Sequence, residues 1–513
     1  DMASKGPNRT PLCCVAAGSV VRWNDSGPFP EPPIPWSTPC RLMPTVPRLA
    51  CLLVVVFVAG CAGTDASAPS ASNEAETEYD AATVENMREG TYNDAFESSY
   101  EPLPATPTLI QDATIMTAAG EPLEDGDLLM RGRQVDTLGT DLPVPDGAQV
   151  VDGSGMYVTP GLIDSHSHLG VSATPEVGPH YDNNEVGMAT PGLWMEHGVW
   201  PQGPGFARAL AGGTTTALLL PGSGDLIEGR GFTAKLLPAR TPQAMKFPDA
   251  PGTLKMACGE NPKGGSGFPT TRMGTANGLR STFLDAQDYR ERWNAWLADP
   301  TGTPPERDLG METLAQVLRG DMLVQVHCYR ADDMATVMEI AQEFAFDIRS
   351  FHHAVEAYKI RDLLAEADIS ASMWSNWWGF KMEAFDGIPE NVPLVHAAGA
   401  RAIVHSDDDL EIQRLHHEAA KALRAGREAG LDISRTEALR WITANPAWAL
   451  GIQDRVGTLE PGKNADVVLW TGDPFSVYTK AQRVWMDGAL VYDRTDPDRQ
   501  PRSDFELGGP RQN

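Results

Sequence analysis

The middle of the chain alternates strand-like and helix-like segments, and this alternation limits the fold more than any other feature. Short apolar runs such as TTTALLLPG, LVQVHCYR, DIRSFHHA and ARAIVHSD are separated by amphipathic stretches such as MATVMEIAQEF and RDLLAEA. Strand–helix units repeated over about 290 residues predict parallel strands joined by helical crossovers. We therefore expect an α/β fold, a (β/α)8 barrel of the TIM type, over residues 159–455.

Both flanks of this region carry the pattern of short antiparallel strands. Runs such as LIQDATIM and DLLMRG fall in residues 108–158, and DVVLW and LVYDR fall in residues 456–494, punctuated by Gly, Asp and Pro. Alternating polar and apolar residues are typical of strands that pack one face on a core. We expect the two flanks to pair into one small β-sandwich domain, followed by a polar tail at 495–513.

An apolar stretch near the beginning, LACLLVVVFVA at residues 49–59, follows two arginines. It is too short to cross a bilayer and has the length of a signal-peptide core, so residues 43–60 are predicted to be a signal peptide. The Val-Ala-Gly-Cys sequence at its end resembles a bacterial lipobox, which makes Cys61 the lipidated residue. The alternative is an ordinary secretory signal. Residues 1–42 are then a non-native segment upstream of the start.

The composition of the chain bears on where the protein is located and on whether it binds nucleic acid. Residues 61–107 are rich in Ala, Ser, Thr and Glu, which predicts a flexible acidic tether behind a lipid anchor. By resemblance to bacterial lipoproteins, Ala62 next to the cysteine implies a location on the periplasmic face of the outer membrane, with the anchor as the protein's contact with the membrane. With 41 Lys and Arg against 69 Asp and Glu, the net charge is −28, which excludes nucleic acid as a partner.

Two cysteines remain in the predicted mature chain besides the lipidated one, Cys258 and Cys328. Two cysteines make no disulfide framework of the kind that stabilises small secreted domains. We expect both to be small buried apolar side chains that face the helices.

Candidate metal ligands end several of the strand-like runs. In TPGLIDSHSHL, His166 and His168 are two residues apart, so on a strand both face the barrel axis and can bind one cation. A His-x-His pair alone is weak evidence, but further polar side chains occur in later runs: Lys255, His327, His353 and Asp407. Barrel enzymes carry their catalytic groups at the C-terminal ends of strands, which is where His327, His353 and Asp407 fall, whereas Lys255 lies within its run.

The segments PGLIDSHSH, HSD, NPAWALGI and GTLEPGKNADVVLW, with the later strand histidines, resemble the amidohydrolase superfamily, particularly its imidazolonepropionase-like and dipeptidase-like branches. The resemblance runs from about residue 108 to 494. It implies a barrel with a β-sandwich made by both flanks, as the strand pattern also predicts. It also implies one or two divalent metal ions per chain, zinc first, with manganese, iron or cobalt as alternatives.

The resemblance assigns a role to each candidate. His166 and His168 would be ligands on the first strand, His327 on the fifth and His353 on the sixth. Asp407, on the eighth strand, would bind metal and act as general base and then general acid. Coordination lowers the pKa of water from 15.7 to roughly 7, so hydroxide becomes available at neutral pH.

The fourth strand offers two candidates. Lys255 resembles the lysine that some members carboxylate to bridge two metals, and Glu260 resembles the glutamate ligand of others. A carboxylated Lys255 predicts a binuclear site suited to amide hydrolysis, whereas a Glu260 ligand fits a single metal equally well. An uncarboxylated buried lysine would need a charge partner.

Other residues could shape the pocket. Tyr329 and Arg330 directly follow His327, and Arg330 could hold a substrate carboxylate or form a structural salt bridge. The tryptophans of MWSNWWGF could line a pocket or pack the barrel rim. His352 should point away from the axis if His353 points inward. The remaining histidines are interpreted as structural or surface residues: His352, His396, His405, His416 and His417.

The leading functional hypothesis is a hydrolase that cleaves a carbon–nitrogen bond of an amide, peptide or cyclic amide with metal-activated hydroxide. Its substrate would be a small molecule or short peptide. A second hypothesis is a mononuclear deaminase of a nitrogen heterocycle, and a third is a binding protein of the envelope that has lost turnover. The sequence leaves the substrate, the native metal and the oligomeric state, including a homo-oligomer, open.

Overall fold

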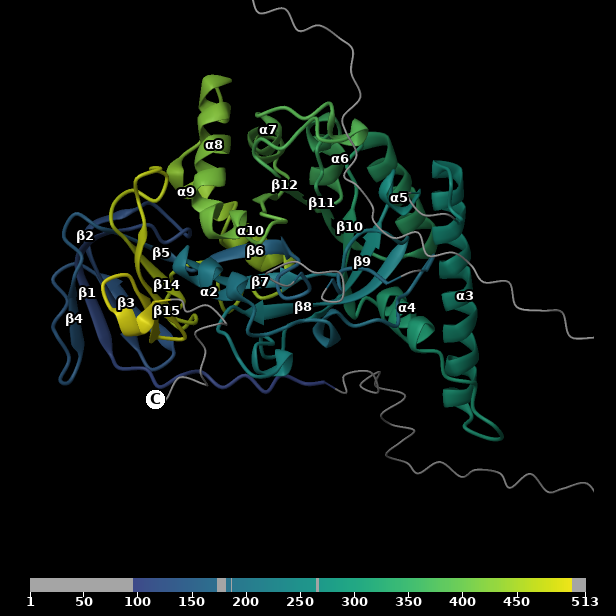
Figure 1. Ribbon diagram of the computed structural model, residues 1–513, viewed down its shortest axis with the longest axis horizontal. Helices are drawn as coiled ribbons and strands as arrows, with labels where there is room; N and C mark the ends of the chain where they lie inside the picture. Colours follow the sequence, from purple (N-terminus) through teal and green to yellow (C-terminus); the bar gives the residue numbers. More distant parts are fainter. Residues whose placement is uncertain (1–95, 173–180, 186, 264–266, 501–513) are drawn as a thin grey trace, which may run out of the picture. The chain divides into compact units, whose positions relative to one another are not determined.

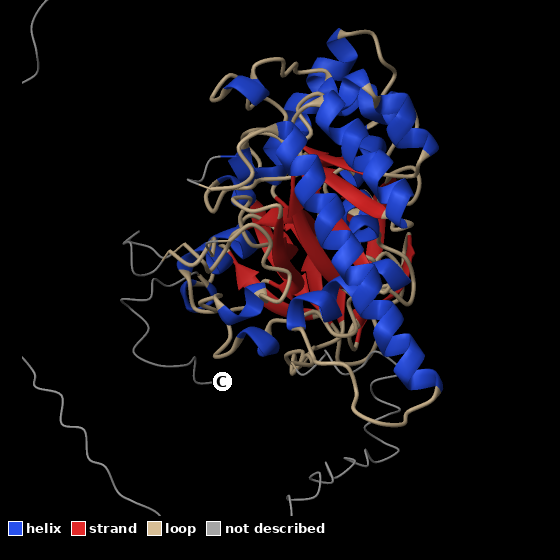
Figure 2. Cartoon of the chain, turned by 90° about the vertical axis from the view of Figure 1, so that its right-hand side faces the viewer, coloured by secondary structure: helices blue, strands red, loops and turns tan. Residues whose placement is uncertain are grey.

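The barrel strands lie inside a layer of helices (Figure 2). The computed structural model describes residues 96–172, 181–185, 187–263 and 267–500. Within them, one sheet of eight strands has the order β13-β12-β11-β10-β9-β8-β7-β6. Its strands are β6 (Leu162–Ser167), β7 (Thr214–Leu219), β8 (Ile227–Lys235), β9 (Gly252–Ala257), β10 (Met322–His327), β11 (Ile348–His352), β12 (Ser370–Met373) and β13 (Ala402–Val404).

The two ends of this sheet come together and nearly close the barrel. The backbone N–H of Asp407, just beyond β13, donates to the carbonyl of His166 on β6 at 3.2 Å. The Asp164 carboxylate on β6 accepts from the N–H of Ser406 at 3.2 Å. The α/β class is therefore confirmed, and the closure is consistent with the predicted TIM-type barrel.

One strand departs from the predicted all-parallel arrangement. β8 pairs antiparallel with both β7 and β9, whereas the other neighbouring strands of the barrel sheet pair in parallel. The expectation of parallel strands throughout the barrel is therefore wrong at β8. The connection over residues 220–226 is too short for a helical crossover, so the chain can only turn back on itself.

Helices cover the outside of the barrel (Figure 1). Helix α4 shows how the local sequence sets the ends of such a helix. At its start, the Asp308 side chain accepts hydrogen bonds from the backbone N–H groups of Gly310 and Met311, and at its end Gly320 adopts a positive φ. The α-helices are α2 (Pro204–Ala211), α3 (Arg272–Ala298), α4 (Leu309–Arg319), α5 (Ala331–Phe344), α6 (Arg361–Glu366), α7 (Asn391–Ala397), α8 (Leu415–Glu428), α9 (Arg435–Arg440) and α10 (Ala444–Ala449). Short 3-10 helices are η3 (Met195–His197), η4 (Pro242–Ala244), η5 (Asn261–Lys263), η6 (Ala357–Lys359), η7 (Met382–Ala384), η8 (Glu411–Arg414) and η9 (Pro497–Arg499).

The two flanks of the chain pair, as the sequence predicts. β14 pairs antiparallel with β5, and β5 continues past the expected boundary at residue 158. In the described part of the chain the flanks form one sheet of order β16-β15-β14-β5-β1-β2-β3, with β4 paired to β1, so a two-layer sandwich stays a prediction. The strands are β1 (Thr108–Ile115), β2 (Leu123–Arg131), β3 (Gln134–Gly139), β4 (Gln149–Asp152), β5 (Tyr157–Pro160), β14 (Val467–Trp470), β15 (Ala481–Met486) and β16 (Ala489–Asp493).

The packed chain begins before residue 108, which corrects the end of the predicted tether. The ring of Phe96 packs edge to face against that of Trp194. The backbone carbonyl of Phe96 accepts a hydrogen bond from Lys246 Nζ at 2.8 Å. The Tyr100 hydroxyl donates to Asp487 at 2.7 Å. Burial and hydrogen bonds such as these compensate the entropy lost on ordering a polar segment. The segment at 1–42, the signal peptide at 43–60, Cys61 and the tether up to residue 95 lie outside the described residues.

A disulfide joins Cys258 and Cys328, two residues that the sequence analysis interpreted as unlinked apolar side chains. They follow β9 and β10, adjacent parallel strands in register, so their Cα atoms lie 5.2 Å apart. Sequence spacing hid this pairing because 70 residues separate the two cysteines. No helix among the described residues has the length and apolar character needed to cross a bilayer.

Candidate metal centre

The ends of two barrel strands, β6 and β13, bring the first three predicted ligands together. The Nε2 atoms of His166 and His168 lie 3.3 Å apart, and both face Oδ1 of Asp407, at 3.4 and 3.2 Å. These three side chains offer ligand atoms that all lie within 4.8 Å of one another. Such spacing suits nitrogen and oxygen ligands that share one cation.

Asp407 faces a second pair of histidines with its other oxygen. Its Oδ2 lies 3.5 Å from Nδ1 of His353, and the rings of His353 and His327 have centroids 4.7 Å apart. Both Asp407 and His353 have a positive φ, +58° and +55°. Side chains other than glycine rarely adopt this conformation, and it recurs where a protein fixes the position of a functional group.

The tautomer of His168 follows from its neighbours. Its Nδ1 lies 2.7 Å from the carbonyl oxygen of Leu220, which can only accept a hydrogen bond. Nδ1 therefore carries the proton, and Nε2 directs a lone pair toward Asp407 and His166. A neutral histidine with one free lone pair is the form that binds a metal.

A chain of hydrogen bonds sets the tautomer of His166 in the same way. Gln325 Nε2 donates to the carbonyl of Ala449 at 3.1 Å, so its Oε1 is the atom that accepts from His352 Nε2 at 2.8 Å. His352 Nδ1 must then accept from His166 Nδ1, 3.0 Å away. His166 is left with a lone pair on Nε2. The expectation that His352 points away from the axis is wrong, and we call Gln325, His352 and His166 the tautomer relay.

The described site fits a cation. Both ring nitrogens of His327, Nδ1 of His353 and Oδ1 of Asp407 are buried and have no hydrogen-bond partner among the described residues. Burying unpaired polar atoms is costly, and a metal satisfies such lone pairs directly. Burial also lowers the pKa of the histidines well below its ordinary value, which keeps them neutral: His166, His327, His352 and His353.

Lys255 lies fully buried on β9 beneath this cluster. Its Nζ donates to the carbonyls of Pro221 and Gly222 and to Ser223 Oγ, at 3.0, 2.9 and 2.9 Å. Burial lowers the pKa of Lys255 to about 8, against the opposing charge of Glu228. Glu228 is thus the charge partner that an uncarboxylated lysine requires, and a neutral amine is accessible near neutral pH.

Glu260 lies apart from the group of candidate metal ligands. It lies beyond β9, with Oε1 3.9 Å from Nζ of Lys381. Its backbone N–H donates to Glu383 at 2.9 Å. The geometry therefore associates Glu260 with a lysine at the mouth, whereas the described metal-ligand group consists of His166, His168 and Asp407.

A pocket of about 400 Å3 opens over the cluster. Its lining combines the histidines and Asp407 with polar groups of the loops: His168, Tyr181, Asn183, Asn184, Gly222, Ser223, Gly224, Asn261, His327, Tyr329, His353 and Asp407. This volume suits a small molecule or a short peptide. Tyr329 lies in the lining, as the sequence predicts for a substrate-binding residue, and its ring centroid is 4.7 Å from that of His327.

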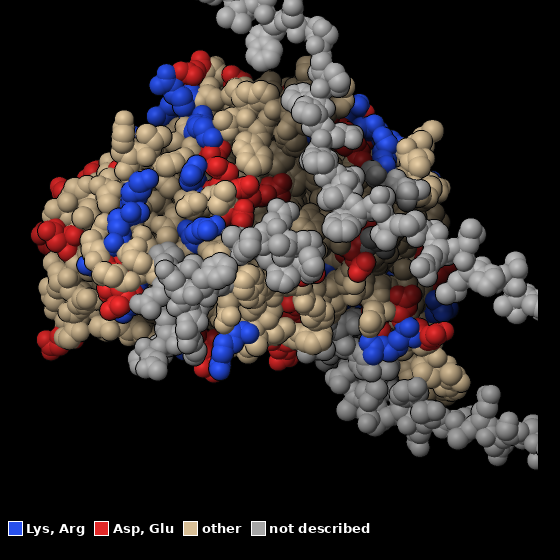
Figure 3. All heavy atoms as spheres, viewed as in Figure 1, with Lys and Arg blue, Asp and Glu red and all other residues tan. Residues whose placement is uncertain are grey.

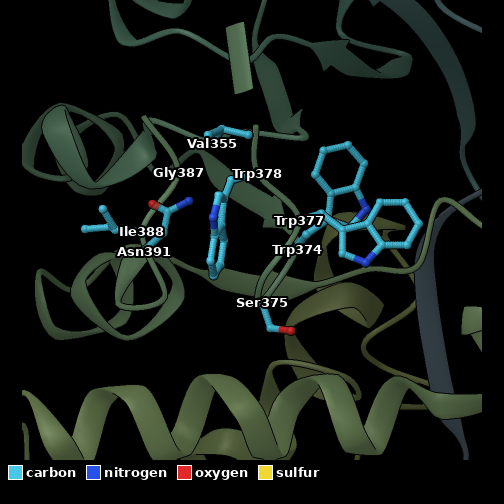
Figure 4. A pocket seen from close by; sticks show the side chains of 8 residues that line it. All are labelled: Val355, Trp374, Ser375, Trp377, Trp378, Gly387, Ile388 and Asn391. Atoms are coloured by element: carbon cyan, nitrogen blue, oxygen red, sulfur yellow. The ribbon is translucent and has the colours of Figure 1, made fainter. Parts of the chain in front are cut away.

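Aromatic side chains from the loop after β12 form one side of the site. The ring of Trp374 lies 4.7 Å from that of His353 and stacks on Trp377 at 5.3 Å. Figure 4 shows Trp374 and Trp377 beside each other, with Trp378 lining a smaller pocket with Ile388 and Asn391. Both predicted uses of these tryptophans are therefore present, since Trp374 is buried at the site and Trp378 is exposed at the rim.

Two basic residues near the mouth, Arg330 and Lys381, have different kinds of partner. Arg330 Nε and Nη2 donate to the two carboxylate oxygens of Asp332, each at 2.8 Å. The salt bridge, one of its two predicted roles, is therefore the one that the structure shows. Lys381 is different: its Nζ lies 4.2 Å above the ring of Tyr329 and donates to Asn261 Oδ1 at 2.5 Å.

Comparison with known proteins places this site in a family. A family model with the description "Amidohydrolase family" matches residues 272–492. The solved structure of an amidohydrolase from Thermotoga maritima MSB8 has a TM-score of 0.70 and 33% identity, and the match covers 75% of this chain and 100% of that one. The chain belongs to the amidohydrolase family. The predicted superfamily is thereby confirmed, and membership supports an enzyme that hydrolyses carbon–nitrogen bonds.

Other relatives of this amidohydrolase differ in length and in the activity that their names give. Amidohydrolase tasK of Hapsidospora irregularis is 32% identical over 433 residues, which are 75% of this chain and 43% of that protein. The chain therefore spans less than half of tasK. A 5-methylthioadenosine/S-adenosylhomocysteine deaminase of Pelotomaculum thermopropionicum is 22% identical over 395 residues, 70% of this chain and 84% of that protein. The specific branch of the superfamily stays a prediction.

Several residues at the site of this amidohydrolase were not predicted from its sequence. Gln325 precedes His327 by two positions on β10, so strand periodicity alone would have placed both on the inner face. His405, interpreted as structural, lies in the cluster of rings and accepts the backbone N–H of His353 at 3.3 Å. Lys381 and Asn261 come from loops, and nothing in their local pattern signals the pocket.

Proposed function

We propose that this amidohydrolase is a metal-dependent hydrolase that cleaves the carbon–nitrogen bond of an amide, peptide or cyclic amide. The observation that carries the proposal is the convergence of His166, His168 and Asp407. His327 and His353 present unpaired buried nitrogens beside them. When bound there, a divalent metal such as zinc supplies the Lewis acidity that makes hydroxide available near neutral pH and polarises the scissile carbonyl.

The protein's own groups have separate tasks in this scheme. Asp407 is partly exposed to the pocket and accepts the proton of the attacking water, then delivers it to the leaving amine. The tautomer relay and Leu220 keep His166 and His168 in the form that binds metal. Trp374 and Tyr329 exclude water from one side of the pocket.

A small substrate is supported by the pocket and by charge. A volume of about 400 Å3 accommodates a dipeptide-sized molecule. The net charge of −28 disfavours polyanions, and on the face in Figure 3 Lys and Arg are interspersed with Asp and Glu. A mononuclear deaminase is the second candidate, favoured by the likeness to a protein named as a deaminase over most of its length.

Export and lipid anchoring through Cys61 remain proposals that rest on residues 43–61. The disulfide between Cys258 and Cys328 supports them, because disulfides persist in oxidising compartments such as the periplasm. The pair is buried and joins two barrel strands beside His327, so it also holds a predicted ligand strand in place.

The first experiment counts metals. The full chain is expressed with zinc or manganese and bicarbonate, and metals per chain are measured by elemental analysis in wild type, Lys255→Ala and Glu260→Ala. His396→Ala is the matched control, since His396 pairs with Glu437 outside the cluster. We expect about two metals in wild type, at most about one in Lys255→Ala, and no change in the other two variants.

The released product distinguishes the candidate functions. Loaded protein is incubated with N-acyl amino acids, dipeptides and cyclic amides, and with aminated heterocycles, and primary amine and ammonia are assayed separately. Amine release by a protein with two metals supports the proposal. One metal that is insensitive to Lys255→Ala, together with ammonia release, would favour the deaminase. Bound metal without turnover would favour a binding protein, and no metal at all would refute metal dependence.

A further inference from the structure

Lys381 stands at the mouth of the pocket, on the loop between β12 and η7. Its Nζ lies 4.2 Å above the ring of Tyr329, and that ring lies 4.7 Å from the ring of His327. The ammonium group is thus one aromatic ring away from a predicted metal ligand. Asn261, which lines the pocket, holds it there by accepting its hydrogen bond at 2.5 Å.

The charge of this ammonium is only loosely balanced. Oε1 of Glu260 is 3.9 Å away, which is an ion-pair distance and longer than a hydrogen bond. The Lys381 side chain is 27% exposed, so it is accessible from the solvent side. An ammonium has three N–H donors, and the contact with Asn261 uses one of them.

Neighbouring cations are committed to protein partners. Arg330 is bound by both carboxylate oxygens of Asp332. Arg272 contacts Asp333 and Glu383. Lys255 is buried and donates to the Pro221 and Gly222 carbonyls. Of these described cations, Lys381 is the one with N–H donors left for a substrate anion beside Tyr329.

We propose that Lys381, positioned by Asn261, binds a carboxylate of the substrate, which makes the substrate class N-acyl amino acids and dipeptides with a free C-terminal carboxylate. This inference rests on the proposed amide hydrolysis. In such molecules the carboxylate is attached one carbon from the scissile nitrogen, so it lies near the reacting carbonyl. A cation one ring away from the histidine cluster matches that separation, and the charge-assisted hydrogen bond orients the amide.

The aromatic side chains on one side of the pocket determine which acyl group the probe substrates should carry. Trp374 stacks near His353 at 4.7 Å, and Trp377 stacks on Trp374. An aromatic acyl group fits beside such rings. The probes are therefore N-benzoyl amino acids and benzoyl-capped dipeptides, each prepared as the free carboxylate and as the uncharged C-terminal carboxamide.

The experiment compares four full-length proteins loaded with metal: wild type, Lys381→Met, Lys381→Arg and the control Lys480→Met. Lys480 is an exposed lysine on the loop before β15. We expect wild type to prefer carboxylates over carboxamides in kcat/KM by about 10- to 100-fold. Lys381→Met should abolish this preference, mainly through KM for carboxylates, while Lys381→Arg retains most of it and Lys480→Met retains all of it.

Two results would overturn the assignment of Lys381. One is a wild type without preference for carboxylates, although it hydrolyses the carboxamides. The other is an undiminished preference in Lys381→Met. If no amide of either series is hydrolysed, the proposed function itself fails. Metal content and melting temperature are measured for each variant, so that a folding defect in Lys381→Met is recognised, and Lys381→Arg then decides the outcome.

Discussion

At the scale of single residues, the site depends on lone pairs whose direction is set by neighbours. His168 is fixed by one carbonyl, and His166 by the tautomer relay that ends at Ala449. Asp164 links the residues around His166 to those before Asp407, because its carboxylate accepts hydrogen bonds from the backbone N–H groups of His166 and Ser406. Burial raises the pKa of Asp164 to about 7 in spite of these hydrogen bonds. The strands that carry His166 and Asp407 are thereby held together.

The relay gives a testable consequence. In Gln325→Met the acceptor for His352 Nε2 is lost, so the proton of His166 is no longer confined to Nδ1 and the metal-binding lone pair is less often available. We expect metal affinity to fall about 10- to 100-fold, the usual effect of losing such a partner. Affinity is measured by competition with a chelator.

Gln325→Glu is the matched control, because its carboxylate still accepts from His352. It should bind metal more tightly than Gln325→Met, even though its contact with the Ala449 carbonyl is lost. Equal affinities of Gln325→Met and wild type would show that the relay does not set the tautomer.

The sequence predicted the candidate metal ligands, but it did not predict the residues that orient them or the lysine at the mouth of the pocket. The His-x-His pattern on a strand, and a histidine or aspartate at each later strand end, place His166, His168, His327, His353 and Asp407 near one another. The relay could not be predicted in full, since His352 and Gln325 meet His166 only when three strands curve into one barrel. Lys381 is brought to the pocket by a loop, whose path no periodicity encodes.

At the scale of elements, helix α8 connects the barrel to the flanking sheet. Its His416 is buried, and its ring lies 4.7 Å from that of Trp470 on β14. Neither ring nitrogen has a hydrogen-bond partner among the described residues. Burial lowers the pKa of His416 to about 3, so the side chain stays neutral in the folded protein.

Acid should therefore weaken this contact. The unfolded chain binds the proton near the ordinary pKa of about 6.5, so the stabilisation is fully present above that pH. It is lost progressively as the pH falls from about 6.5 toward about 3, and the loss is about 2 kcal/mol at pH 5. His416→Phe removes the titration and keeps the ring.

Urea unfolding at pH 7.5 and pH 5.0 measures the effect. The free energy of unfolding of wild type should fall by about 2 kcal/mol more than that of His416→Phe over this interval. Equal decreases would mean that His416 reaches water in the folded state. The comparison of the two proteins cancels the contribution of the histidines at the metal site.

Among the strands and helices, β8 was the element that the sequence pattern did not reveal. Its sequence IEGRGFTAK contains two glycines and two basic residues, yet all nine positions are buried. Strand pairing on both sides and partners for the charged side chains make this burial tolerable. A local pattern cannot show those partners. The capping box at the start of α9, by contrast, involves Ser434 and Glu437 alone, so the local Ser-x-x-Glu pattern is enough to indicate it.

At the scale of the whole described unit, a buried ion cluster joins the barrel to the flanking sheet. Lys235, at the end of β8, contacts Asp466 at 3.1 Å and Asp487 at 2.9 Å. Tyr100 donates to Asp487 from the segment that precedes β1, and burial raises its pKa. Three distant parts of the sequence thus meet at one lysine.

Removing the lysine should destabilise the protein strongly. Lys235→Met leaves two buried carboxylates without their cation, and we expect the free energy of unfolding to fall by about 3–5 kcal/mol. Urea denaturation at pH 7.5 measures it. The surface variant Lys480→Met serves as control and should change the free energy by less than about 0.5 kcal/mol. A loss in Lys235→Met no larger than that would mean that the cluster is hydrated.

The sequence alone determined the features that depend on local patterns: alternating strands and helices, the strand ends that carry the candidate ligands, and flanks that pair beyond the barrel. Closure of the barrel decided the rest. It brought Cys258 to Cys328, turned His352 toward His166 and gave Lys235 its carboxylates. These contacts join residues far apart in the chain, and their energies depend on burial and distance, which exist only once the strands are placed in three dimensions.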